Sequence, residues 1–168
     1  MKYSIVLFPS KEVQEVANSY RKRYDPAYAL VQPYIRLKEA FEADDTQIAA
    51  LSAQLEDIAK STSSFSINFH RASTFHPTTN VIFLSFQNKE AVENLHASIM
   101  RYFGDHQEEF AFVPHLTIGR DLSESELKDV VDQLGMMKFD LPSEITNLHV
   151  LKEEVDGKWS IVRSFPLA

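Results

Sequence analysis

Two short polar pairs in this sequence combine residue types and a spacing that suit chemistry on an anion. One apolar residue separates His115 from Thr117, and one separates Tyr34 from Arg36. An imidazole can accept or donate a proton at neutral pH, and a guanidinium keeps its charge and binds phosphate through two parallel hydrogen bonds. A free phenol is protonated at neutral pH, so it can donate a proton but starts in the wrong form to act as a base.

Both pairs belong to segments that the pattern predicts to be β-strands. The side chains of a strand alternate between its two faces, so His115 and Thr117 share one open face while their apolar neighbours turn to a core. The same alternation gives Tyr34 and Arg36 one open face. If a twofold axis relates the two strands, the two polar pairs face each other across a cleft.

The elements around these pairs follow one order twice: strand, helix, strand. Asp44 with Gln47, and Ser123 with Glu126, have the spacing of capping boxes at helix starts. Asp156-Gly157 is a hairpin signal between the last two strands. We expect strands near 3–8, 30–37, 65–70, 81–86, 115–119, 145–151 and 159–165, and helices near 10–23, 44–60, 88–103 and 123–134.

The two halves also resemble each other in residues. Lys11-Glu12 corresponds to Lys89-Glu90, and the segment 33–37 corresponds to 114–118, at nearly equal separations. The repeat predicts an α+β fold with two pseudo-twofold-related β-α-β lobes, whose antiparallel sheets surround a central cleft. We expect one bilobal domain over residues 1–168, with approximate lobes 1–78 and 79–168, because no linker composition separates the halves.

At these residues the sequence resembles the two-histidine (2H) phosphoesterases, within the 2′-5′ RNA ligase-like superfamily. The mark of that family is a pair of His-x-Thr/Ser-x motifs on facing strands. The second motif stands here as His115-Leu116-Thr117-Ile118, after Phe112-Val113-Pro114. The resemblance covers nearly the whole chain and is strongest to the bacterial YjcG-type branch, including the segments Ile5-Val6-Leu7-Phe8-Pro9-Ser10 and Ser19-Tyr20-Arg21-Lys22-Arg23-Tyr24-Asp25.

The resemblance implies metal-independent chemistry without a cofactor on a small cyclic phosphodiester: a 2′,3′-cyclic nucleotide, cyclic ADP-ribose phosphate or an RNA end. It implies that His115 and its counterpart act as acid and base, and that the hydroxyls hold the phosphate. This sequence departs from the family at its first motif, where Tyr34 stands for the histidine and Arg36 for the threonine. We therefore expect His115 and Tyr34 as catalytic residues and Thr117 and Arg36 as phosphate ligands.

Loss of one acid or base costs roughly 10²–10⁴ in rate, so the departure leaves open whether the protein is an enzyme. The first hypothesis is a divergent phosphoesterase. The alternative is a catalytically impaired module that binds a nucleotide or an RNA end. A scaffold that has lost the site altogether is a third interpretation.

The other histidines have weaker claims to function. His70, His96 and His106 are expected to be solvated, and His149 to be a residue of a sheet face. His76 lies in a loop before the second half and is the one candidate to replace the missing base.

Composition excludes several other functions. The 168 residues include no cysteine and four glycines, none in a phosphate-loop or dinucleotide pattern, so thiolate catalysis and nucleotide binding of those kinds are excluded. The net charge of −7 argues against general affinity for nucleic acid. No metal-ligand spacing and no membrane span are visible. We expect a monomeric, cytoplasmic protein whose partner is a small phosphodiester or nucleotide, and we interpret Arg21-Lys22-Arg23 as a cationic last helical turn.

Overall fold

The computed structural model describes residues 1–104 and 112–168, and it has the α+β architecture that the sequence predicts. Its four helices and eight strands lie within these described residues. The helices are α1 (Lys11–Tyr24), α2 (Asp45–Lys60), α3 (Glu90–Phe103) and α4 (Glu124–Leu134). The strands are β1 (Lys2–Leu7), β2 (Ile35–Glu42), β3 (Phe65–Thr74), β4 (Ile82–Gln87), β5 (Leu116–Gly119), β6 (Leu141–Ile145), β7 (Asn147–Glu153) and β8 (Trp159–Pro166).

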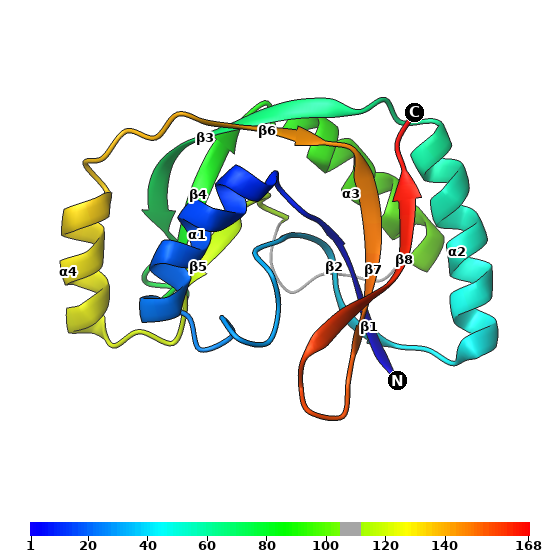
Figure 1. Cartoon of the computed structure of the whole chain (residues 1–168), viewed down its shortest axis with the longest axis horizontal. Coiled ribbons are helices and arrows are strands. Elements are labelled where there is room, and N and C mark those ends of the chain that lie inside the picture. Colours follow the sequence, from blue (N-terminus) through cyan, green and yellow to red (C-terminus); the bar gives the residue numbers. More distant parts are fainter. Residues whose placement is uncertain (105–111) are drawn as a thin grey trace.

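All eight strands form one curled antiparallel sheet in the order β6-β3-β4-β5-β2-β1-β7-β8. The centre of this sheet is the pair β5 and β2, which carry the two polar motifs. In Figure 1, α4 and α2 mark the two ends of the long axis, and the sheet runs between them. β3 pairs with β4 and β6, while the expected lobe boundary near residue 78 stays a prediction.

The central pair has the symmetry that the sequence repeat suggests. Ile35 pairs directly with Leu116, and these two residues are equivalent positions in the two repeats. Residues related by a twofold axis between two antiparallel strands must pair with each other in this way. The pseudo-twofold relation of the two halves is therefore visible in the register itself.

Each crossover helix packs on the central strand of the other half. α1 follows β1 but packs on β5 and β6, whereas α3 follows β4 but packs on β2. α2 packs on β7, β8 and α3, and α4 packs on β3. The end of α1 therefore meets the end of β5, which brings residues 24–25 against residues 119–120.

The expected inward and outward faces are confirmed at the central strands. Ile35, Leu37, Leu116 and Ile118 are buried in the hydrophobic core. On the opposite face, Arg36 is exposed, and the three residues His115, Thr117 and Tyr34 are half-buried.

Local start and stop signals are partly confirmed. Both capping boxes are present, at Asp44 with Gln47 and at Ser123 with Glu126. The residue at the α3 N-cap is Lys89, whereas Asn88 adopts a left-handed backbone with φ of 64°. Residues 30–34 form turns and coil before β2 begins at Ile35. Hydrogen bonds from Trp159 and Arg21 hold the carbonyls of Leu30 and Val31. The sequence pattern also missed β6.

Candidate active site

The register of the central strands brings the two polar pairs together. Ile35 lies opposite Leu116 in an antiparallel pair, so Arg36 lies beside His115 and Tyr34 beside Thr117. All four side chains are on the face that the core leaves open. We call Tyr34, Arg36, His115 and Thr117 the central polar face. The four residues that the sequence singled out are thus neighbours in space, whereas their roles stay a proposal.

The ring of His115 is fixed in one orientation by three contacts. Its Nδ1 lies 2.6 Å from the carbonyl oxygen of Val113. The rings of Phe75 and Phe83 meet it edge-on, with centroids 4.9 and 5.1 Å away. A carbonyl only accepts, so Nδ1 carries the proton and donates it, which leaves Nε2 of the neutral ring as a proton acceptor.

The charge state of His115 also favours a proton acceptor. Burial lowers the pKa of His115 below its ordinary value, and the positive charges of Arg36, Arg120 and Lys89 lower it further, against the opposing effect of the Val113 hydrogen bond. The imidazole is therefore neutral at neutral pH. The same three cations lie near His115 in a chain whose net charge is −7, so the local charge here is opposite in sign to that of the chain as a whole.

Arg120 extends the central polar face at the end of β5. Its Nε lies 2.9 Å from Oδ1 of Asp25, in an ion pair and not in a well-aligned hydrogen bond. Its charge also interacts with Tyr34. Burial by itself would lower the pKa of Arg120, but Tyr34 and Asp25 together raise it. Arg120 therefore connects the central polar face to the buried carboxylate of Asp25.

Asp25 is the buried anchor of this connection, with 5% of its surface exposed. It accepts a hydrogen bond from the backbone N–H of Ala27 and pairs with Arg21, whose Nε is 3.4 Å from Oδ2. Arg21 is buried as well, and its guanidinium donates to the carbonyl of Val31 at 2.7 Å. The last turn of α1 is cationic as expected, but Arg21 is an interior residue that holds the segment leading to Tyr34.

Close packing at one glycine keeps Asp25 within reach of Arg120. A Cβ at Gly119 would lie 3.1 Å from Cβ of Tyr24 and 3.4 Å from its carbonyl oxygen. The N–H of Arg120 donates to that same carbonyl at 3.0 Å. A side chain at this position would force its neighbours to shift by a few tenths of an ångström, so a glycine suits this close approach of α1 to β5.

Sequence reasoning missed three of the charged residues that shape the site. Arg120 directly follows the recognised motif, and that position was the one available signal. Asp25 looked like a helix breaker before Pro26, and Lys89 looked like one half of an internal repeat. Nothing in their spacing shows that Asp25 and Arg120 pair, because the contact depends on α1 crossing to the other half of the sheet.

The remaining histidines are placed as follows. The expectation for His96 is wrong: it is 8% exposed, bonds the carbonyl of Leu37 through Nδ1 at 2.7 Å, and stacks on Phe112. His70 is half-buried, and His106 lies outside the described residues.

His149 lies on β7 against the Phe8 ring and bonds Ser164 through Nδ1 at 2.8 Å, in agreement with a sheet-face residue. His76 is exposed and follows Phe75, whose ring touches His115. Its role as a replacement base stays a prediction.

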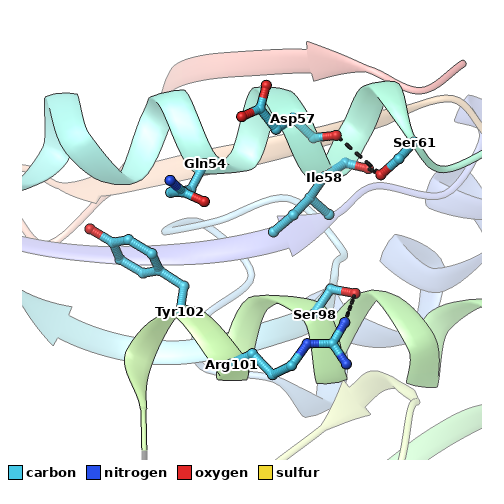
Figure 2. A pocket seen from close by; sticks show the side chains of 7 residues that line it. All are labelled: Gln54, Asp57, Ile58, Ser61, Ser98, Arg101 and Tyr102. Carbon is cyan, nitrogen blue, oxygen red and sulfur yellow. Dashed lines mark hydrogen bonds between the residues drawn. The ribbon is translucent and has the colours of Figure 1, made fainter.

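Two cavities lie away from the central polar face. One, of about 200 Å³, lies between α2 and β8. The other, of about 430 Å³, lies between α2 and α3, and Figure 2 shows its lining residues Gln54, Asp57, Ile58, Ser61, Ser98, Arg101 and Tyr102. Their side chains carry both signs of charge, and the Arg101 guanidinium donates to the Ser98 hydroxyl. We place the candidate site on the sheet because cations and a neutral histidine converge there, whereas no histidine lines either cavity.

The described residues hold neither a metal-binding group of side chains nor a membrane-spanning helix. Within residues 1–104 and 112–168, no three His, Asp or Glu side chains come together as a metal site. No helix in the same ranges is long and apolar enough to cross a membrane.

The fold and the polar motifs define a protein of the 2′-5′ RNA ligase superfamily, and this chain belongs to that family, whose model matches residues 9–157. A Geobacillus sp. (strain WCH70) protein named "Putative phosphoesterase" is 42% identical over 165 residues, which are 98% of this chain and 95% of that protein. A protein of the same name from Oceanobacillus iheyensis is 37% identical over 99% of this chain and 98% of its own length.

The solved structures support the fold independently. Escherichia coli LigT complexed with 3′-AMP matches with a TM-score of 0.76 at 16% identity, covering 99% of this chain and 98% of LigT. LigT has also been solved complexed with NADP⁺, with phosphate and with ATP. At this identity the likeness concerns the fold alone.

Proposed function

We propose that the protein is a divergent phosphoesterase that binds a small phosphodiester on the central polar face and hydrolyses it without a metal. The substrate class is a 2′,3′-cyclic nucleotide, cyclic ADP-ribose phosphate or an RNA end. The observation that carries the proposal is the antiparallel pairing of Ile35 with Leu116, which makes neighbours of a neutral histidine, a phenol, a hydroxyl and a guanidinium. The LigT complexes with 3′-AMP, NADP⁺ and ATP support a ligand of this class.

We assign different roles to His115 and Tyr34. Nε2 of the neutral His115 accepts the proton of the attacking water. Tyr34 gives its phenolic proton to the leaving ribose oxygen. The hydroxyl of Thr117 and the guanidinium of Arg36 hold the phosphate oxygens, and Arg36 does so with a permanent charge.

Turnover in the presence of a chelator is the direct test. We expect 2′,3′-cyclic AMP to be opened with EDTA present, and His115→Ala to lower kcat by roughly 10²–10⁴. His149→Asn is the matched control, since it changes another half-buried histidine away from the central polar face. No turnover of any member of the substrate class at high protein concentration would contradict the phosphoesterase.

A second candidate function is favoured by one observation: Tyr34 and Arg36 occupy positions where the family has histidine and threonine. This exchange removes an acid-base group and adds an anion ligand, which suits a module that binds a nucleotide or an RNA end unchanged. Calorimetry with 2′,3′-cyclic AMP, followed by analysis of the recovered nucleotide, distinguishes the two. Recovery of intact 2′,3′-cyclic AMP after binding, with binding lost in Arg36→Gln, would favour the module.

A further inference from the structure

Two stacked phenylalanine rings adjoin His115, and the function proposed above gives them no role. The rings of Phe75 and Phe83 are parallel to within 28°, and their centroids are 4.4 Å apart. We propose that the outer face of the Phe75 ring binds the base of the substrate by stacking. This role rests on the proposed function and deepens it, because it selects substrates in which a base is attached to the ribose that carries the scissile phosphate.

The register of the sheet places the two rings at the edge of the central polar face. Phe83 is on β4 and pairs directly with Thr117, so both side chains are on the same face of the sheet. Phe75 directly follows β3, the next strand of the sheet. β5 lies between β4 and β2, so a phosphate held at Thr117 has the guanidinium of Arg36 on one side and the stacked rings on the other.

One face of the Phe75 ring is covered by neither of its neighbouring rings. Phe83 packs on the opposite face and is itself 5% exposed. The ring of His115 is almost equally distant from both, with its centroid 4.9 Å from Phe75 and 5.1 Å from Phe83. A ring on the outer face of Phe75 would lie much farther from Phe83, so His115 is at the side of the stack. Phe75 is half-buried, which agrees with one covered face and one accessible face.

The backbone around Phe75 holds its ring in place before a ligand binds. The carbonyl of Phe75 accepts a hydrogen bond from the N–H of Thr78 at 2.8 Å. The hydroxyl of Thr74 accepts from the N–H of His76 at 3.1 Å and donates to the carbonyl of Val81 at 2.7 Å. These bonds tie the loop to the end of β3 and to the residue before β4. Little conformational freedom is therefore lost when a base stacks on the ring.

A neutral aromatic face favours a base over the other parts of the substrate. A phenyl ring has no charge for a phosphate, whereas every base has a π-face that can stack on it. A purine covers more of the ring than a pyrimidine does. In a 2′,3′-cyclic nucleotide and at an RNA end, the base and the scissile phosphate share one ribose, whereas the ribose of cyclic ADP-ribose phosphate that carries the cyclic phosphate has no base. Phe75 therefore selects the first two substrate classes, with a purine at the reacting end.

Calorimetry with two ligands tests the stacking without any need for turnover. 3′-AMP carries a base that ribose 3-phosphate lacks, and we expect 3′-AMP to bind roughly tenfold more tightly or better. Phe75→Leu should weaken the binding of 3′-AMP at least about fivefold more than that of ribose 3-phosphate. Phe75→Tyr keeps an aromatic face and should retain the preference for 3′-AMP. Phe139→Leu is the matched control, because Phe139 is another half-buried phenylalanine and packs against Tyr20 of α1.

The kinetic constants distinguish a stacking surface from a side chain that only holds His115. A stacked base is bound in the ground state as well as in the transition state, so Phe75→Leu should raise the KM for 2′,3′-cyclic AMP more than it lowers kcat. The unaltered protein should have a higher kcat/KM for 2′,3′-cyclic AMP than for 2′,3′-cyclic CMP, and Phe75→Leu should reduce that difference. A fall in kcat at unchanged KM would overturn the proposal and make Phe75 a positioning residue for His115.

Equal affinities of the unaltered protein for 3′-AMP and ribose 3-phosphate would also overturn the proposal, and this measurement needs no variant to fold. Equal losses of affinity for the two ligands in Phe75→Leu would overturn it as well. If the protein binds 3′-AMP through Phe75 and cleaves no phosphodiester, the proposed hydrolysis fails while the stacking role stands. Binding of neither ligand would overturn both.

Discussion

His115 is held as a neutral base by the same surroundings that attract an anion. Its Nδ1 proton is committed to Val113, and burial with three nearby cations lowers its pKa. A substrate that brings negative charge offsets those cations. The pKa of His115 is therefore low before a ligand binds. The negative charge of a bound ligand then raises this pKa, which favours the transfer of a proton from water to His115.

The pH dependence of activity follows from this lowered pKa. The base form of His115 exists above its pKa, so kcat/KM should fall only as the pH drops through a value below the ordinary 6.5 or so of histidine. Arg36→Gln removes one cation, so the pKa should rise and the acidic limb should move to higher pH. NMR titration of the ring protons checks both shifts.

His149 is the internal control for that titration. Its pKa is also lowered, but by burial alone. Arg36→Gln should therefore leave the titration of His149 where it is. Equal movement of the two histidines would mean that Arg36 acts through the fold and not through its charge on His115.

We expect the affinity for 3′-AMP to depend on Arg36. A charge-assisted hydrogen bond contributes about 1.5–3 kcal/mol, so Arg36→Gln should weaken 3′-AMP binding roughly tenfold to hundredfold by calorimetry. Arg163→Gln, which removes the same charge elsewhere, should change the Kd by less than about twofold. Equal losses of 3′-AMP affinity in the two variants would show that Arg36 contributes only to the net charge and does not bind the phosphate directly.

The single residues of the site divide into those that the sequence could predict and those it could not. Strand alternation alone put His115 with Thr117 and Tyr34 with Arg36, because the spacing of side chains on a strand is fixed. Arg120 escaped that reasoning, because its partner Asp25 is far away in sequence and belongs to a different element. Contacts between elements depend on packing, which periodicity does not encode.

At the scale of elements, the contact between α1 and β5 depends on Gly119. Gly119→Ala puts a methyl group 3.1 Å from Tyr24 Cβ, and overpacking of this kind costs about 1–3 kcal/mol. We expect urea unfolding to show a loss in that range, together with a lower kcat, because Asp25 moves away from Arg120. A variant as stable and as active as the unaltered protein would contradict this account of the contact.

Most elements could be predicted, and the exceptions have physical reasons. The two capping boxes were visible because their partners are three residues apart. β6 was missed because it contains Pro142, which argues against a strand except at the edge of a sheet, and β6 is an edge strand. The turns before Tyr34 were missed because they depend on the guanidinium of Arg21, in α1, as well as on local hydrogen bonds such as that from the Ala27 N–H to Asp25.

At the scale of the whole molecule, the last two residues hydrogen-bond to segments that are distant in sequence. The N–H of Ala168 donates to Thr62 and its carbonyl accepts from Ser64, while Leu167 is buried and donates to Thr146. These bonds tie the end of the chain to the end of α2 and to the segments before β3 and β7. The last two residues are therefore held to the rest of the structure, although Ala168 itself is exposed.

Removal of Leu167 and Ala168 should destabilise the protein by about 2–4 kcal/mol, from one buried leucine and the lost hydrogen bonds. Urea unfolding measures this loss. Val155→Ala is the control for apolar content, since Val155 is fully exposed, and it should change the free energy of unfolding by less than about 0.5 kcal/mol. A truncated chain as stable as the full one would show that the terminal contacts contribute nothing.

The strand order also determines when this protein can fold during its synthesis. β1 lies between β2 and β7 in the sheet, so its second edge waits for residues 147–153 to leave the ribosome. At ordinary rates of translation this delay is on the order of ten seconds. Throughout that time the nascent chain carries an apolar strand, Ile5, Val6 and Leu7 among its residues, with one unpaired edge that other chains can pair with. A ribosome that stalls before residue 147 therefore leaves an aggregation-prone fragment, and chaperone demand during expression is concentrated in the interval before the last two strands emerge.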